Sequence, residues 1–395
     1  MSKRVAVGVA ALVALLLVVG AASTHLPNGI GFLSAGTSVS SATTSTSSAA
    51  GGVPPIPKTN SPVASPGKWL PDNPAIVGNS SKIDYPPYYA VLANFTLGVI
   101  NKDRSSAGLS PVILSSVPSG QQHADSMAFY GYFSHWDNQG YKPYMRYSLL
   151  GGTGGVAENA ALNYCNSSPP DSTNPTPAPC GLQTVENAIN GSQWEMMNND
   201  TTCCNNGHRE NILQPMHNRV SVGVAYNSSA VYLVEDFENS YITSESLNLA
   251  GGVVTFQGSV GHHIPGWMRT SAGAEITVYF DPIPGGIGLN ELNLLPSCSQ
   301  FNELSEPSSC QYQGAYTPGV QVSTVFAPCP ANYVCSAGNY TYAQTWQEAA
   351  GNFNIVFSIS GLESTYGNGI YTFYLWPTAS TSEPITSLSV FVKGA

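Results

Sequence analysis

Charged side chains are the scarcest feature of this 395-residue sequence. Only 9% of the residues are Asp, Glu, Lys or Arg, against about a quarter in ordinary globular domains. The net charge is −10, with 13 Lys and Arg in total and no basic cluster, which argues against nucleic acid as a partner. Because buried His and Glu are costly unless they are paired, hydrogen-bonded or bound to a metal, the few such residues carry weight.

Several well-known catalytic motifs are also missing. The sequence has no H-E-x-x-H, no G-x-S-x-G and no P-loop, so the commonest signatures of zinc proteases, serine hydrolases and nucleotide-binding enzymes are absent. Ser134 and His135 are adjacent, and neighbours in sequence rarely face each other as a triad requires. These absences leave open whether the protein is an enzyme.

Only the N-terminus carries a long hydrophobic run. Lys3 and Arg4 precede an apolar stretch over residues 5–22, which predicts a signal peptide or an N-terminal membrane anchor for residues 1–22. The positive flank places the rest of the chain outside the cell in either case. We therefore expect a secreted or cell-surface-anchored protein, with the membrane contacted only through residues 5–22 if they are not cleaved.

Large apolar residues are scarce from residue 23 to residue 83. This Ser/Thr/Ala/Gly-rich and then Pro-rich stretch buries too little apolar surface to offset the entropy of ordering, so it is predicted to be a disordered stalk. An exported chain also invites glycosylation at N-x-Ser/Thr triplets, which equally arise by chance in an Asn- and Ser-rich chain. They occur at Asn79, Asn94, Asn166, Asn190, Asn199, Asn227 and Asn339.

The eight cysteines predict disulfides, as expected of an exported chain. The first four are Cys165, Cys180, Cys203 and Cys204. Because bonding between the adjacent Cys203 and Cys204 is strained, two of their three pairings remain open. In the C-terminal half, the pairs 298–310 and 329–335 are expected.

Residues 84–242 have the periodicities of an α+β domain. Helices are predicted over 87–106, 119–132, 143–150 and 185–198, with a short helical turn at 207–213. Strands are predicted over 156–162 and for the alternating apolar residues of 220–224 and 231–233. Together they imply a helix–sheet–helix sandwich. The helix over 185–198 is expected to be buried on two sides, because Trp194 lies opposite its apolar face.

A series of short motifs follows along this part of the chain: Ile100–Asn101 with Arg104 and Gly108–Leu109, Phe133–Ser134–His135, Glu158–Asn159, Trp194, Gly207–His208–Arg209–Glu210–Asn211–Ile212–Leu213, and Val222–Gly223–Val224. In type and order these motifs resemble the CAP superfamily, the cysteine-rich secretory protein, antigen 5 and pathogenesis-related 1 group, and in particular its shorter prokaryotic secreted (SCP) members. That resemblance implies an αβα sandwich and a cleft in which two His and two acids converge.

Carried over by motif, His135 and His208 are the two imidazoles and Glu158 is the first carboxylate. The family's second acid follows the helix Trp by three residues, where this chain has Met197, so Glu195 is only a candidate cleft acid. Some family members bind zinc, and two His, one Glu and a water would form an open Zn²⁺ site. An equally weighted alternative is that the same residues hydrogen-bond to one another and stabilise the fold.

Two further histidines are assigned no role in this cleft. We expect His123 to pack on its helix and His217 to lie at the surface.

In residues 247–395 the pattern is different: apolar residues occupy every second position in short stretches, and Gly and Pro separate the stretches. This pattern predicts an all-β antiparallel sandwich. The strands expected are centred on Val254/Phe256, Ile276/Val278/Phe280, Val320/Val322/Thr324, Ile355/Phe357/Ile359, Tyr371/Phe373/Leu375 and Leu388/Val390/Val392.

The leading hypothesis is therefore an exported CAP-domain protein that acts by extracellular binding of a lipid, a protein or cell-wall material, with a divalent metal as an option. One alternative is a metal-dependent extracellular hydrolase of peptides or cell wall. Another is a structural component of the envelope in which the cleft has no chemical role.

Overall fold

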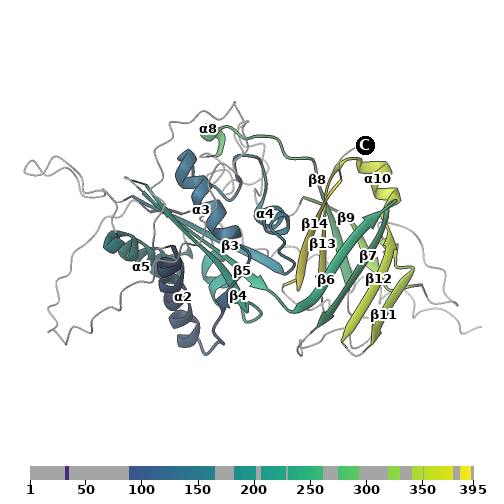
Figure 1. The fold of residues 1–395 in the computed structure, drawn as a ribbon, viewed down its shortest axis with the longest axis horizontal. Helices are drawn as coiled ribbons and strands as arrows, with labels where there is room; N and C mark the ends of the chain where they lie inside the picture. The colour runs from purple at the N-terminus through teal and green to yellow at the C-terminus, as the bar shows by residue number, and fades with distance from the viewer. Residues whose placement is uncertain are drawn as a thin grey trace, which may run out of the picture.

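The computed structural model describes residues 32–34, 89–164, 182–201, 206–227, 230–260, 275–292, 319–329, 340–349, 351–376 and 383–392. These residues form two regions that lie side by side, a mixed helix–sheet region and a β-rich region (Figure 1). The α+β fold class with a following β-sandwich is as predicted, whereas the exact domain boundaries at 84–242 and 247–395 stay a prediction.

A five-stranded sheet forms the centre of the first region, with the strand order β1-β3-β5-β4-β2. The three central strands β3, β5 and β4 pair antiparallel, and the short edge strands β1 and β2 pair parallel to their neighbours. The strands span Phe32–Ser34 (β1), Ile113–Leu114 (β2), Gly155–Tyr164 (β3), Arg219–Tyr226 (β4) and Ala230–Asn239 (β5). β1 falls inside the predicted stalk, which otherwise lies outside the described residues.

Helices cover both faces of this sheet (Figure 1). Successive strand residues point to opposite faces, so Ala160 and Leu162 of β3 join the apolar core under α3, whereas Ala161 joins the core under α2 and α5. The predicted helices are all present, as α2 (Tyr89–Ser106), α3 (Ser119–Tyr130), α4 (Pro143–Leu149), α5 (Leu182–Asn198) and α7 (Gly207–Ile212).

A buried arginine fastens α2 to the segment after α7. The side chain of Arg104 is fully buried, and its guanidinium donates hydrogen bonds to four backbone carbonyl oxygens. Such a fork of fixed donors can satisfy several carbonyl oxygens at once. The acceptors belong to Ser110, Ile212, Gln214 and His217, at 2.7–3.0 Å.

Two sheets and one apolar core make up the β-rich region. The predicted strands are present, and three more, β6, β10 and β11, were not predicted. β10 pairs parallel to β9, an exception to the expected antiparallel pattern. One sheet has the order β11-β12-β7-β6 and the other β10-β9-β8-β13-β14. The elements are β6 (Ile242–Ala250), β7 (Val253–Val260), β8 (Glu275–Asp281), β9 (Val320–Phe326), β10 (Tyr340–Tyr342), β11 (Thr345–Ala349), β12 (Asn352–Ser358), α10 (Ser360–Tyr366), β13 (Gly369–Trp376) and β14 (Thr386–Val392). The short helix α8 (Leu289–Leu292) follows β8 but packs on the core under α3 of the first region (Figure 1).

The last strand of the β-rich region packs directly on the first region. In β14, Ser387 N–H donates to the carbonyl oxygen of Gly154 at 3.2 Å, and Thr386 Oγ1 donates to that of Thr153 at 2.6 Å. The backbone of Ser389 donates to Ser148 Oγ at 3.0 Å. These bonds fix the β-rich region beside α4 and β3, the elements that carry the functional site.

Several predictions fall on residues outside the described part of the chain, including the N-terminal segment 1–22 and every cysteine except Cys329. Cys329 is disulfide-bonded, while the predicted pairings stay predictions. Among the predicted glycosylation sites that are described, Asn227 is buried and Asn94, Asn190 and Asn199 are exposed. No helix in the described residues is both long enough and apolar enough to cross a membrane.

Candidate functional site

Four ionisable side chains meet on the α3–α4 face of the central sheet. Glu158 on β3 receives a hydrogen bond from Arg146 Nη2 at Oε2 (2.6 Å), and its Oε1 lies 2.8 Å from His135 Nδ1. His123 Nδ1 lies 3.0 Å from Glu158 Oε2 and 2.8 Å from Arg146 Nη2. The structure therefore brings His135 and Glu158 together, as predicted, and adds His123 and Arg146.

Each member of this His/Glu/Arg cluster is placed by a different element. His123 lies on α3, His135 follows α3 in a loop, Arg146 lies on α4 and Glu158 on β3. Arg146 Nη1 also donates to the carbonyl oxygens of His135 and Tyr141, each at 2.9 Å. One guanidinium thus holds both the carboxylate and the loop that carries His135.

Burial and the charge of Arg146 determine the protonation of the cluster. Burial lowers the pKa of His123, and the neighbouring guanidinium lowers it further, which favours a neutral ring that accepts a hydrogen bond from Arg146. Burial alone would raise the pKa of Glu158, but the imidazoles and Arg146 outweigh burial and hold it well below its usual value. A neutral His123 beside an ionised Glu158–Arg146 pair follows from these shifts.

A second acid stands beside Glu158, and it is Asp236 rather than Glu195. Asp236 pairs with Glu158 across β3 and β5 and accepts a hydrogen bond from Ser119 Oγ at 2.5 Å. Burial and then the negative charge of Glu158 raise the pKa of Asp236 well above its usual value. The predicted acid Glu195 is partly exposed on α5 and accepts from Asn199 Nδ2 at 2.8 Å.

His208 lies on the other face of the sheet. Its Nδ1 is 2.6 Å from Asp200 Oδ1, and its carbonyl oxygen accepts from the side chain of Asn159 at 3.2 Å. Because Asn159 directly follows Glu158 in β3, the two side chains point to opposite faces. The expectation that both imidazoles would share one pocket with Glu158 therefore does not match this arrangement.

The described residues do not suit a metal ion at the predicted set His135, Glu158 and His208. No three His, Cys, Asp or Glu side chains are grouped so as to hold a metal within the described part of the chain. Both oxygens of Glu158 already face hydrogen-bond donors, one of them on the cationic Arg146. A cation there would also meet the repulsion of that guanidinium.

Two other expectations are wrong. His217 is buried rather than exposed, with Nδ1 2.8 Å from the carbonyl oxygen of Asn211 and its ring stacked on Phe237 at 5.3 Å between centroids. Trp194 is 58% exposed, so α5 is not buried on the side where that side chain lies.

His123 and Arg146 were missed as members of the cluster. For His123 a signal was available, because Gly120, Ala124 and Met127 are also buried and the spacing puts all four on one face of α3. Arg146 had no comparable signal, since a basic residue in the last turn of a short helix usually stabilises the helix end.

Comparison with known proteins covers the part of the chain that holds these residues. Residues 97–237 match the family model described as CAP, the cysteine-rich secretory protein family. A search of curated proteins finds no match to the chain. The family resemblance inferred from the sequence is confirmed for this range, which begins within α2 and ends within β5.

Proposed function

From the premise that residues 97–237 form a CAP domain, we propose that this protein acts outside the cell by binding and that its His/Glu/Arg cluster stabilises the domain rather than catalysing a reaction. Its ligand would be a lipid, a protein or cell-wall material. Export is supported by the charged-then-apolar N-terminus and by the secretory description of the family.

One observation carries this proposal: Glu158 is enclosed and already paired. Its side chain is fully buried, and both oxygens contact His123, His135 or Arg146 within 3.0 Å. A general base must come within hydrogen-bond distance of a substrate proton, and a carboxylate in this state is closed to a substrate. A buried ion pair of this kind is well suited to fixing a conformation.

The experiment compares zinc binding, hydrolysis and stability in the full chain. Wild type and the variants His135→Ala, His208→Ala and the double variant are titrated with ZnCl₂ by calorimetry, and each is assayed on a peptide mixture and on cell-wall material. We expect lower stability in each variant, no zinc-binding heat that depends on the two histidines, and no hydrolysis.

Zinc binding that disappears in the double variant, together with hydrolysis that disappears with it, would overturn the proposal in favour of the metal-dependent hydrolase. To separate binding from a purely structural role, sedimentation of the wild type with lipid vesicles and with cell-wall material is measured. Absence of any association would favour the envelope component.

A further inference from the structure

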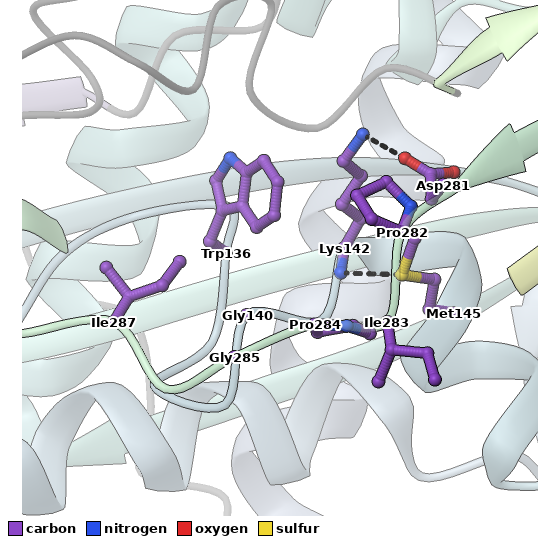
Figure 2. A pocket seen from close by; sticks show the side chains of 10 residues that line it. All are labelled: Trp136, Gly140, Lys142, Met145, Asp281, Pro282, Ile283, Pro284, Gly285 and Ile287. Carbon is purple, nitrogen blue, oxygen red and sulfur yellow. Dashed lines mark hydrogen bonds and ion pairs between the residues drawn. The ribbon is translucent and has the colours of Figure 1, made fainter. Parts of the chain in front are cut away.

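A pocket of about 420 Å³ opens between the two regions, next to the loop that carries His135. Figure 2 shows that one wall comes from the CAP domain, with Trp136, Lys142 and Met145, and the other from the segment that follows β8. That segment, residues 282–288, is named the strap here. A site of this size is in the usual range for small organic ligands.

The strap is held against the CAP domain by backbone contacts. Ile287 N–H donates to the carbonyl oxygen of Asn138 at 3.1 Å, and Ile287 itself is buried in the core beneath α3. Gly140 has φ of +85°, and a Cβ there would lie 2.5 Å from the carbonyl oxygen of Gly285. The loop around Gly140 and the strap therefore approach each other closely at the floor of the pocket. Because both segments belong to the chain itself and contact each other directly, the pocket is preformed.

The charges in the wall cancel. Lys142 Nζ lies 2.7 Å from Asp281 Oδ1 and 5.0 Å from the centre of the Trp136 ring. The other oxygen of Asp281 accepts from Tyr144 Oη at 2.8 Å and from Gly319 N at 3.3 Å. Lys142 neutralises the charge of Asp281, and both carboxylate oxygens already accept hydrogen bonds. The wall therefore has no unbalanced charge that would favour a charged ligand.

The other side chains that line the pocket are apolar. They include a flat indole, a thioether and a run of proline and isoleucine side chains, which offer dispersion contacts. The indole N–H of Trp136 is itself buried. A sugar ring entering such a site would lose the hydration of its hydroxyl groups without regaining hydrogen bonds from Asp281. The residues concerned are Trp136, Met145, Pro282, Ile283, Pro284 and Ile287.

We infer that this seam pocket, formed by the CAP domain and the strap, binds a small uncharged ring compound of mainly hydrocarbon character. The indole of Trp136 and the stem of Lys142 form one side for the ring, and Ile283 and Pro284 form the other (Figure 2). This inference goes beyond the proposed function and does not depend on the His/Glu/Arg cluster. It concerns a site that exists only when the CAP domain and the strap are together.

The test uses N-phenyl-1-naphthylamine, an uncharged aromatic probe whose fluorescence rises in apolar sites. It is titrated into the full chain and into the variant Ile283→Asp. Ile283 is 49% exposed, so a carboxylate is tolerated by the fold but adds a charge that the bound ring would desolvate. We expect a dissociation constant of roughly 10–100 μM for the wild type and at least tenfold weaker binding by the variant.

Ile113→Asp is the matched control, because Ile113 is an apolar side chain of similar exposure (56%) that does not line the pocket. Its binding should equal that of the wild type, and thermal unfolding verifies that all three proteins are folded. Absence of probe binding, or equal binding by Ile283→Asp, would overturn the inference. So would a methyl glucoside that binds more tightly than the probe, since the ligand would then be a polar ring.

Discussion

At the scale of single residues, Glu158 is the group on which the CAP domain's buried polar cluster depends. Its carboxylate contacts side chains from α3, from the loop after α3 and from α4. Removing one member of a buried ion pair leaves the other charge without compensation, and this costs about 3–5 kcal/mol. The residue that would be left uncompensated here is Arg146.

We therefore predict that Glu158→Gln lowers the free energy of unfolding by about 3–5 kcal/mol, measured by urea denaturation near neutral pH. Glu195→Gln serves as the control, because this partly exposed carboxylate accepts a hydrogen bond from the exposed Asn199 and lies away from the cluster. The free energy of unfolding of Glu195→Gln should differ from that of the wild type by no more than about 0.5 kcal/mol. Similar losses in the two variants would contradict the assigned role of Glu158.

The sequence identifies part of this cluster. His135 and Glu158 are correctly expected to meet, because each belongs to a motif of the resembled family. His208 was wrongly expected to join them, because the motif does not show which face of β3 it packs on. In the structure its backbone contacts Asn159, which follows Glu158 and therefore points to the opposite face. A motif fixes the order of residues along the chain, whereas the face that each residue occupies depends on the registers of β3 and of the helices packed on it.

At the scale of elements, α3 and β4 pack with their backbones in close approach. A Cβ added to Gly223 would overlap the carbonyl oxygen of Gly120, and a Cβ on Gly120 would overlap that of Ser221. The two glycines allow the helix to approach the strand backbone, and Gly120 N–H donates to Ser221 Oγ at 3.1 Å. This contact gives a physical reason for the Val-Gly-Val sequence around Gly223.

A pair of glycine substitutions tests this explanation. Gly223→Ala is expected to destabilise the protein by more than about 3 kcal/mol, since backbone atoms cannot yield to the added methyl group. Gly98→Ala, in the middle of α2 with open space around it, should stabilise by about 0.5–1 kcal/mol. Melting temperatures that fall equally in both variants would refute the packing argument.

Helices and strands were predictable where one period dominates. The alternation in β7, β8 and β12 and the 3.6-residue period in α2 locate these elements in the sequence. β10 and β11 were missed because they are short and their side chains are mostly exposed or partly exposed, so neither shows the alternation of a strand packed on a core. β6 was missed because polar residues dominate its sequence.

At the scale of the whole molecule, many carboxylates are buried with few cations to balance them. Burial raises the pKa of Glu235 to about 8 and that of Glu383 to about 7, and those of Asp125 and Asp137 to about 6. A group whose pKa is raised by folding stabilises the fold below its unfolded pKa. That stabilisation is lost as pH rises through the folded value.

We predict that the free energy of unfolding is greatest near pH 4–5 and falls steadily toward pH 8, as measured by urea denaturation at several pH values. Glu235→Gln replaces the titrating group by a neutral one of the same shape. The free energy of unfolding of the variant should therefore fall less steeply with pH than that of the wild type. The difference in slope is expected to be up to roughly 1.4 kcal/mol per pH unit between pH 5 and 8.

Glu210→Gln, which changes an exposed carboxylate on α7, is the control and should leave the slope unchanged. A wild-type protein that is more stable at pH 8 than at pH 5 would contradict this prediction. The same dependence agrees with the scarcity of charge in the sequence, because carboxylates that stay protonated need no cationic partners.

The hydrogen bonds from β14 to Thr153, Gly154 and Ser148 have a consequence for biosynthesis. A ribosome makes the CAP domain long before it makes residues 386–392, so the nascent domain emerges with this flank bare. The flank is covered only after residues 386–392 have been translated. Docking of β14 on the CAP domain is therefore a late event relative to the synthesis of that domain.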